Sequence, residues 1–109
     1  MSPVLFAVAV APPVAGTACP AKNRGAALSD SQVIDGPADE RAILHDDETH
    51  RRGRATIATW KVGYVYDAGR QVHLLCRYKG RPSIVVRIAR RVATCRYVER
   101  GRRESLACR

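Results

Sequence analysis

The sequence predicts a small, mainly β domain: an antiparallel sheet of four to five strands with one short helix, held together by disulfides. Segments in the second half of the chain alternate between apolar and polar residues, which is the pattern of half-buried strands. The chain also contains four cysteines, an even number within 109 residues, as is typical of small disulfide-stabilised domains. This length fits a single domain.

The clearest strand is predicted at residues 70–80. Val72, Leu74, Cys76 and Tyr78 alternate with polar residues and share one face, which we expect to be buried. His73 lies on the opposite, charged face, where we expect a partly exposed histidine without a catalytic role. Turn residues separate the other predicted strands, which lie at residues 53–63, 84–88, 95–99 and 104–108.

One helix is predicted, at residues 37–44. Asp35 is a suitable N-cap, and Pro37 is favoured in the first turn of a helix. Asp39 and Glu40 follow, where negative charge favours a helix N-terminus. The next ten residues, 45–54, are strongly polar and are expected to form an exposed connection.

The first 18 residues contain no charged side chain and resemble an export signal in their order of segments. Their apolar run, residues 4–11, is too short to span a membrane but suits a signal peptide, and small residues follow it. The expected cleavage lies between Ala18 and Cys19, which leaves residues 19–109 as one exported domain, periplasmic or secreted, without a transmembrane span. Gly16 stands where a lipid-anchor signal favours leucine. The alternative is an apolar strand at residues 3–10.

The spacing of the cysteines favours disulfides over zinc. Structural zinc sites usually bring their ligands in close pairs, and no such pair occurs here. The last two strands flank the polar turn at residues 100–103, and a hairpin with this turn places Cys95 opposite Cys108. That pairing, one of three possible connectivities, leaves Cys19 for Cys76.

Positive charge is concentrated in the C-terminal part of the chain. Residues 1–69 hold 7 basic and 8 acidic residues, whereas residues 70–109 hold 12 basic and 2 acidic ones, so that the whole chain carries +9. Arginine binds phosphate and carboxylate groups through its planar fork. The alternative is a solvated basic face without a ligand. The candidate anion-binding residues are Arg90, Arg91, Arg100, Arg102 and Arg103.

Other functional classes find little support in the sequence. The polar segment 45–50 contains two histidines among three carboxylates, but it matches neither H-E-x-x-H nor a calcium loop. No nucleophile elbow or phosphate-binding glycine motif occurs. Few aromatic residues are available to stack on nucleic-acid bases. The sequence therefore predicts no catalytic residue, no metal and no cofactor, and it disfavours nucleic acid as a partner.

Several short elements also carry a resemblance across most of residues 19–109. The order Cys19-Pro20, Asp35-Gly36-Pro37, a Trp60 strand, Cys76-x-Tyr78 and two later cysteines resembles a family of small uncharacterised exported proteins of Gram-negative bacteria. The resemblance implies export and paired cysteines, and no established activity. From the positive charge of residues 70–109, together with the expected export, we expect a non-catalytic exported protein that binds an anionic envelope component. The alternative is an interaction or inhibitor module that acts on another exported protein through the turn at residues 100–103.

Overall fold

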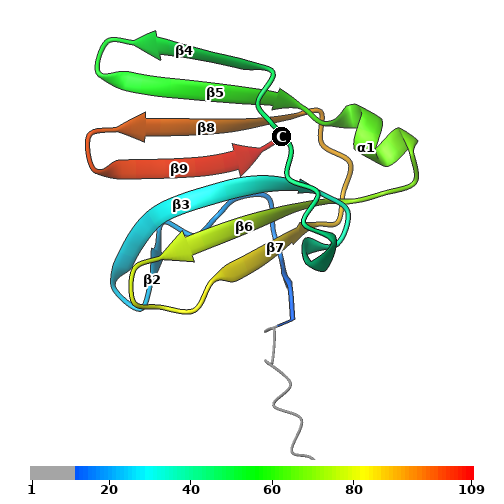
Figure 1. The fold of residues 1–109 in the computed structure, drawn as a ribbon, viewed down its shortest axis with the longest axis horizontal. Helices are drawn as coiled ribbons and strands as arrows, with labels where there is room; N and C mark the ends of the chain where they lie inside the picture. Colours follow the sequence, from blue (N-terminus) through cyan, green and yellow to red (C-terminus); the bar gives the residue numbers. More distant parts are fainter. Residues whose placement is uncertain (1–11) are drawn as a thin grey trace, which may run out of the picture.

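The computed structural model describes residues 12–109, so the alternative strand at residues 3–10 and most of the predicted leader lie outside the described part. Two sheets form the domain (Figure 1), one with strand order β1-β7-β6-β3-β2 and one with order β4-β5-β8-β9. The mainly β class is confirmed, and every strand pair is antiparallel except the β1–β7 pair. The strands are β1 (Val14–Ala15), β2 (Lys22–Asn23), β3 (Ala26–Asp35), β4 (Glu48–Arg52), β5 (Ala55–Lys61), β6 (Val72–Tyr78), β7 (Ile84–Ile88), β8 (Thr94–Arg100) and β9 (Arg103–Cys108).

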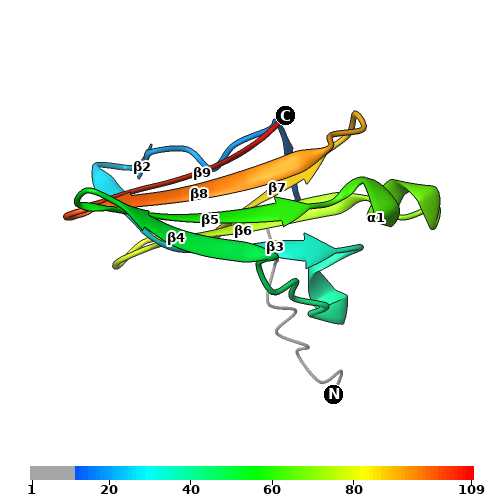
Figure 2. The same cartoon turned by 90° about the horizontal axis from the view of Figure 1, so that it is seen from above.

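The hydrophobic core takes side chains from both sheets, whose strands run along a common direction (Figure 2). The β6 face predicted to be buried is indeed the core face. Burial of such side chains is the main favourable contribution to folding. The cluster comprises Cys19, Leu28, Val33, Val62, Val65, Val72, Leu74, Cys76, Tyr78, Val86, Ile88, Val92, Cys95, Leu106 and Cys108.

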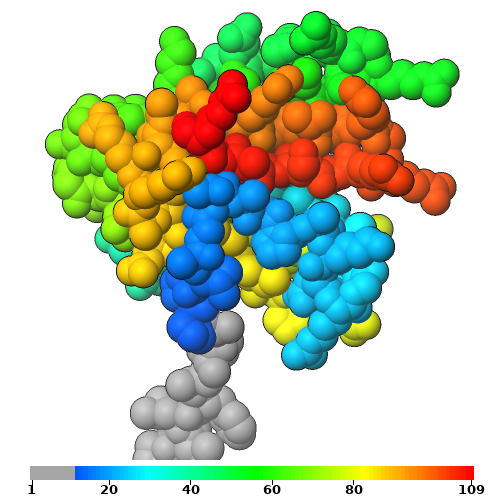
Figure 3. Space-filling view, turned by 180° about the vertical axis from the view of Figure 1, so that it is seen from behind, coloured from blue at the N-terminus to red at the C-terminus, as the bar shows by residue number. Residues whose placement is uncertain are grey.

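A short segment before β2 joins the two sheets. The Cys19 N–H donates to the Leu106 carbonyl (2.9 Å), and the Cys108 N–H donates to the Thr17 carbonyl (2.7 Å). This segment therefore lies along β9 of the four-stranded sheet, and Figure 3 shows it in blue against the red C-terminal strand. Cys19 is also disulfide-bonded to Cys76 in the five-stranded sheet. One stretch of chain thus connects both sheets through backbone and covalent bonds.

The prediction of a helix at residues 37–44 is wrong. Only a single 3-10 turn forms, at Ala38–Glu40, and Arg41 ends it with a φ of +55°. The Leu44 N–H then donates to the Val33 carbonyl (2.8 Å), so the chain pairs with β3 instead of continuing the helix. A helix of two turns is marginal by itself, and pairing with an existing strand satisfies the same backbone groups.

Within the described residues, an α-helix forms at a different place from the predicted one. α1 (Gly63–Asp67) follows β5 and buries Val65 completely. Its sequence, Gly-Tyr-Val-Tyr-Asp, contains residues of low helix propensity and has no capping side chain. Packing of Val65 against the core, rather than local preference, therefore determines this helix.

The guanidinium of Arg70 lies against the Asp35-Gly36 pair. Its Nε donates to Asp35 Oδ1 (2.8 Å), and the guanidinium also pairs with Glu40. Gly36 has a φ of +81°, and a Cβ at this position would come within 2.0 Å of Arg70 Nη2. The positive φ therefore favours glycine, and a side chain at this position would also displace the guanidinium of Arg70 from its place beside Asp35.

The prediction that His73 is partly exposed is wrong. His73 is buried, with 8% of its surface exposed, because β6 lies between β3 and β7 and its neighbour Ile34 is buried as well.

The prediction of an exposed connection at residues 45–54 is also wrong in its structure, since residues 48–52 form the edge strand β4. All five β4 residues are exposed, so the sequence of this strand lacks the apolar–polar alternation by which a strand is predicted. Its charged side chains are typical of an unpaired sheet edge.

Candidate functional site

Two hairpin turns bring five arginines to one end of the four-stranded sheet. The β4–β5 hairpin turns at residues 53–54 and the β8–β9 hairpin at residues 101–102. Gly53 and Gly101 both have a φ of +61°, as the first central residue of a type II′ turn requires. Ala55 pairs with Arg100, so the two turns lie side by side, at the left in Figure 1. We call this group the arginine tip: Arg52, Arg54, Arg100, Arg102 and Arg103.

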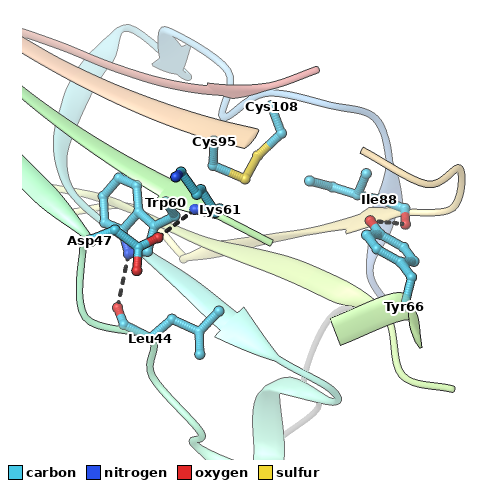
Figure 4. Close-up of a disulfide and its surroundings, with 8 residues drawn as sticks. All are labelled: Leu44, Asp47, Trp60, Lys61, Tyr66, Ile88, Cys95 and Cys108. Atoms are coloured by element: carbon cyan, nitrogen blue, oxygen red, sulfur yellow. Dashed lines mark hydrogen bonds between the residues drawn. A yellow bond between two sulfur atoms is a disulfide. The ribbon is translucent and has the colours of Figure 1, made fainter. Parts of the chain in front are cut away.

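The four-stranded sheet has one face toward the core and one toward solvent. Directly paired residues of an antiparallel sheet lie on the same face. The core-facing set includes Trp60, paired with Cys95, and its indole Nε1 donates to the Leu44 carbonyl (3.1 Å; Figure 4). The alternate positions form the outer face: Glu48, His50, Arg52, Ala55, Ile57, Thr59, Lys61, Thr94, Arg96, Val98, Arg100, Arg103, Ser105, Ala107 and Arg109.

A shallow hollow of about 510 Å³ lies on this outer face. Thr59 and the exposed Ala107 contribute to its lining near the middle of the sheet, together with Ile57, of which only 4% is exposed, and Lys61 and Arg96 contribute cationic groups. The hollow therefore combines apolar surface with positive charge. A shallow surface of this kind suits contact with another macromolecule. Small-molecule sites are usually deeper and enclose most of their ligand.

The positive charges of this region have no ionic partners within residues 12–109. The ion pairs there join Arg70, Arg77 and Arg91 to carboxylates elsewhere in the fold. Glu48 is the one acidic side chain on the outer face, which also carries six lysines and arginines. An exposed surface of this kind attracts anionic groups and accelerates association with them.

The two acidic residues of the β8–β9 hairpin lie on the opposite, core-facing side. Glu99 and Glu104 are direct cross-strand partners. Burial is the main cause that raises the pKa of Glu104, and repulsion from Glu99 and Asp30 adds to it, while the nearby Tyr97 hydroxyl, which donates to Glu99 Oε2 (3.2 Å), opposes the increase. Burial and the nearby carboxylates also raise the pKa of the Tyr97 hydroxyl. These carboxylates therefore do not neutralise the outer face.

Glu104→Gln is expected to stabilise the protein at neutral pH by up to about 1 kcal/mol, because it removes one of two directly opposed like charges. A raised pKa in the folded state means that this carboxyl favours folding when protonated, and that the benefit is lost as pH rises through the folded pKa. Urea unfolding between about pH 4 and about pH 8 should therefore show a less negative slope of stability against pH in the variant. Glu48→Gln, on the exposed edge strand, is the control, and equal slopes for wild type and Glu104→Gln would contradict the prediction.

The candidate residues chosen from sequence do not form one site. Arg100, Arg102 and Arg103 belong to the arginine tip, but Arg90 and Arg91 lie in the β7–β8 loop of residues 89–93. Arg91 Nη1 pairs with Asp67 Oδ1 (2.6 Å), and its guanidinium lies 6.0 Å from the centre of the Tyr66 ring. Its charge is therefore already compensated within the fold.

Sequence reasoning missed Arg52, Arg54 and Arg96. Arg52 and Arg54 fall in the region that was expected to be a loop connection. A signal was nevertheless present, because Arg-Gly-Arg occurs at residues 52–54 and again at residues 100–102. Two glycine turns of identical composition indicate two similar hairpins, although only the pairing of β5 with β8 places them together.

The remaining candidates from the sequence are the four cysteines and the polar segment 45–50. Cys19–Cys76 and Cys95–Cys108 are disulfide-bonded, so none of the four cysteines is a thiolate nucleophile. Within residues 12–109, no group of three or more histidine, cysteine or acidic side chains is placed to hold a metal ion. No helix of this part of the chain is long and apolar enough to cross a membrane. The features that remain are two disulfides and an exposed basic surface.

A comparison with known protein families identifies the family of this chain. The family described as "Type VI secretion system Tli immunity protein" matches residues 21–109, most of the chain and all nine strands except β1. The chain belongs to this family. The assignment is more specific than the resemblance to uncharacterised exported proteins, whose motif order it does not test. No curated protein and no solved structure gives a significant match.

Proposed function

We propose that this chain is a non-catalytic immunity protein that binds a toxic effector of a type VI secretion system and neutralises it in the periplasm. The observation that carries the proposal is the family match over residues 21–109. Two disulfides in a domain of this size support an oxidising compartment. The match favours the inhibition of another exported protein over the binding of an envelope polymer, and the uncompensated basic surface supplies a means of contact.

Export through cleavage between Ala18 and Cys19 belongs to this proposal. Cleavage there would remove Thr17, whose carbonyl accepts a hydrogen bond from the Cys108 N–H. The Cys19 nitrogen would become the N-terminal ammonium, which can still donate to the Leu106 carbonyl, and the Cys19–Cys76 disulfide would remain. The intact mass of protein isolated from the periplasm, before and after reduction, tests both the cleavage position and the two disulfides.

Deletion of the gene should make the source bacterium sensitive to killing by its own parent strain in contact-dependent competition. The physical reason is that an unbound effector retains its activity in the recipient envelope. Survival should return when the chain is supplied with an export signal, and should not return when it is retained in the cytoplasm. An attacker that lacks a functional secretion system is the control. Equal survival of the deletion strain and the parent under attack would refute the proposed function.

A further inference from the structure

We propose that the arginine tip and the neighbouring hollow form one docking surface for a protein partner that presents carboxylates around an apolar side chain. The biological role of this surface rests on the proposed function, in which the partner is the effector. Both features lie on one sheet: the tip row contains Arg100, and the hollow contains Arg96. Four residues separate these positions along β8, which corresponds to about 13 Å, a distance that one protein surface patch easily covers.

The arginine tip is arranged for carboxylates rather than for internal stabilisation. Arg100 and Arg103 are direct cross-strand partners, and like charges in this arrangement destabilise a sheet. Arg52 lies in the same row, because Ala55 pairs with both Arg52 and Arg100. None of the three has an ionic partner in residues 12–109. A bound carboxylate would relieve the repulsion and could accept two parallel N–H bonds from one guanidinium.

The hollow argues for a protein rather than a phosphate polymer. Thr59 and the exposed Ala107 line it, and an apolar side chain of a partner can cover their methyl groups, whereas a phosphate polymer has no group that would. Trp60 is among the residues that line the hollow, but the sheet register puts it on the core side with Cys95, and Tyr97 lies on that side with Leu106, so neither ring is presented for stacking on the outer face. Nucleic acid without base stacking would bind through charge alone.

The rigidity of the turns favours a specific contact over diffuse attraction. Both turns are two-residue connections whose flanking strands pair in continuous register, from residue 48 to 59 and from residue 95 to 108. The backbone that carries Arg54 and Arg102 is therefore fixed before a partner arrives. Preorganised groups lose less conformational entropy on binding, and this raises affinity for a matching surface.

The test compares the purified, disulfide-bonded chain with three variants. Arg54→Glu/Arg102→Glu reverses two charges at exposed turn positions of the arginine tip. Lys79→Glu/Arg90→Glu makes the same change in net charge at exposed positions in the β6–β7 turn and the β7–β8 loop. Ala107→Glu places a carboxylate in the hollow. Because all five positions are exposed, each variant should fold, and circular dichroism with intact mass verifies this.

Three probes identify the partner chemistry: a polyglutamate peptide with one central leucine, the same peptide with glycine in its place, and polyphosphate of matched charge. The leucine peptide should bind wild type at least about tenfold tighter than the glycine peptide, the gain that burial of one leucine side chain supplies. Arg54→Glu/Arg102→Glu should lose at least about tenfold in affinity and Ala107→Glu should lose the preference for leucine, while the control should change by less than about threefold. Equal losses in the two double variants, or equal binding of all probes, would overturn the proposal.

Competition assays separate this inference from the proposed function. If wild type fails to protect the deletion strain, the proposed function is wrong, and the peptide measurements still decide whether the surface binds acidic proteins. If wild type protects and the folded Arg54→Glu/Arg102→Glu protein protects equally well, the effector does not use the arginine tip and the inference is wrong. Protection by the control variant but not by the tip variant supports both.

Discussion

Replacing Cys19 and Cys76 together by alanine is expected to lower the free energy of unfolding by about 4 kcal/mol. The disulfide closes a loop with a sequence separation of 57 residues, and removing it restores the conformational freedom of that loop in the unfolded chain. Both sulfur-bearing residues belong to the core cluster, so the variant also loses packing. Urea unfolding of wild type and Cys19→Ala/Cys76→Ala at one pH measures the difference directly.

The same change should weaken the connection between the two sheets. Cys19 donates its N–H to the Leu106 carbonyl of β9 while its sulfur joins β6, so the disulfide fixes the segment that lies along both sheets. In the uncleaved chain, hydrogen exchange at the backbone amides of residues 19 and 108 should accelerate more than exchange within the β5–β8 pair. A loss below about 1 kcal/mol would mean that the backbone bonds hold the segment without the covalent link.

Much of the sheet structure can be predicted from the sequence because several strands have one buried and one exposed face. β6 is the clear case, with its alternate side chains in the core. Two strands leave no such pattern. β3 is a long strand whose middle, Ser29–Asp30–Ser31, is polar, and β4 is exposed along its whole length. Their place is determined by pairing with β6 and β5, which sequence periodicity does not contain.

The helix errors have a common physical cause. The signals at residues 35–40 are genuine helix-start preferences, and they produce one 3-10 turn. These preferences contribute about 1 kcal/mol or less each, whereas residues 42–44 satisfy their backbone groups by pairing with β3. α1 shows the reverse, because burial of Val65 stabilises a helix that has little local preference. Tertiary contacts decide both segments.

The candidate site could be found only in part. The concentration of arginine in the C-terminal part of the chain is visible in the sequence, and it led to Arg100, Arg102 and Arg103. Their neighbours Arg52 and Arg54 come from a hairpin nearly fifty residues earlier, and only the β5–β8 pairing places the two turns together. Arg91 shows the opposite error, since its partner Asp67 lies in α1, a helix that the sequence did not predict.

Removal of the second disulfide, by Cys95→Ala/Cys108→Ala, should lower the free energy of unfolding by about 3 kcal/mol. The expected loss is smaller than for Cys19–Cys76 because the closed loop is shorter, with a sequence separation of 13 residues. Both sulfurs are buried beside Leu106, and the alanines should leave a small cavity that adds to the loss. Thermal and urea unfolding of the two double variants, measured side by side, should give this order of stability, and the reverse order would show that local packing outweighs loop entropy.

The Cys95–Cys108 variant also separates stability from binding. Its disulfide lies at the open end of the β8–β9 hairpin, whereas Arg100 and Arg103 lie at the turn, and four cross-strand pairs hold the register between them. At a temperature where the variant remains folded, it should therefore bind the leucine-containing polyglutamate peptide with the affinity of wild type. A folded variant that binds more weakly would mean that the disulfide itself sets the geometry of the arginine tip. Unchanged binding would locate the contact in the turns, where the arginines and not the cysteines determine which partner is accepted.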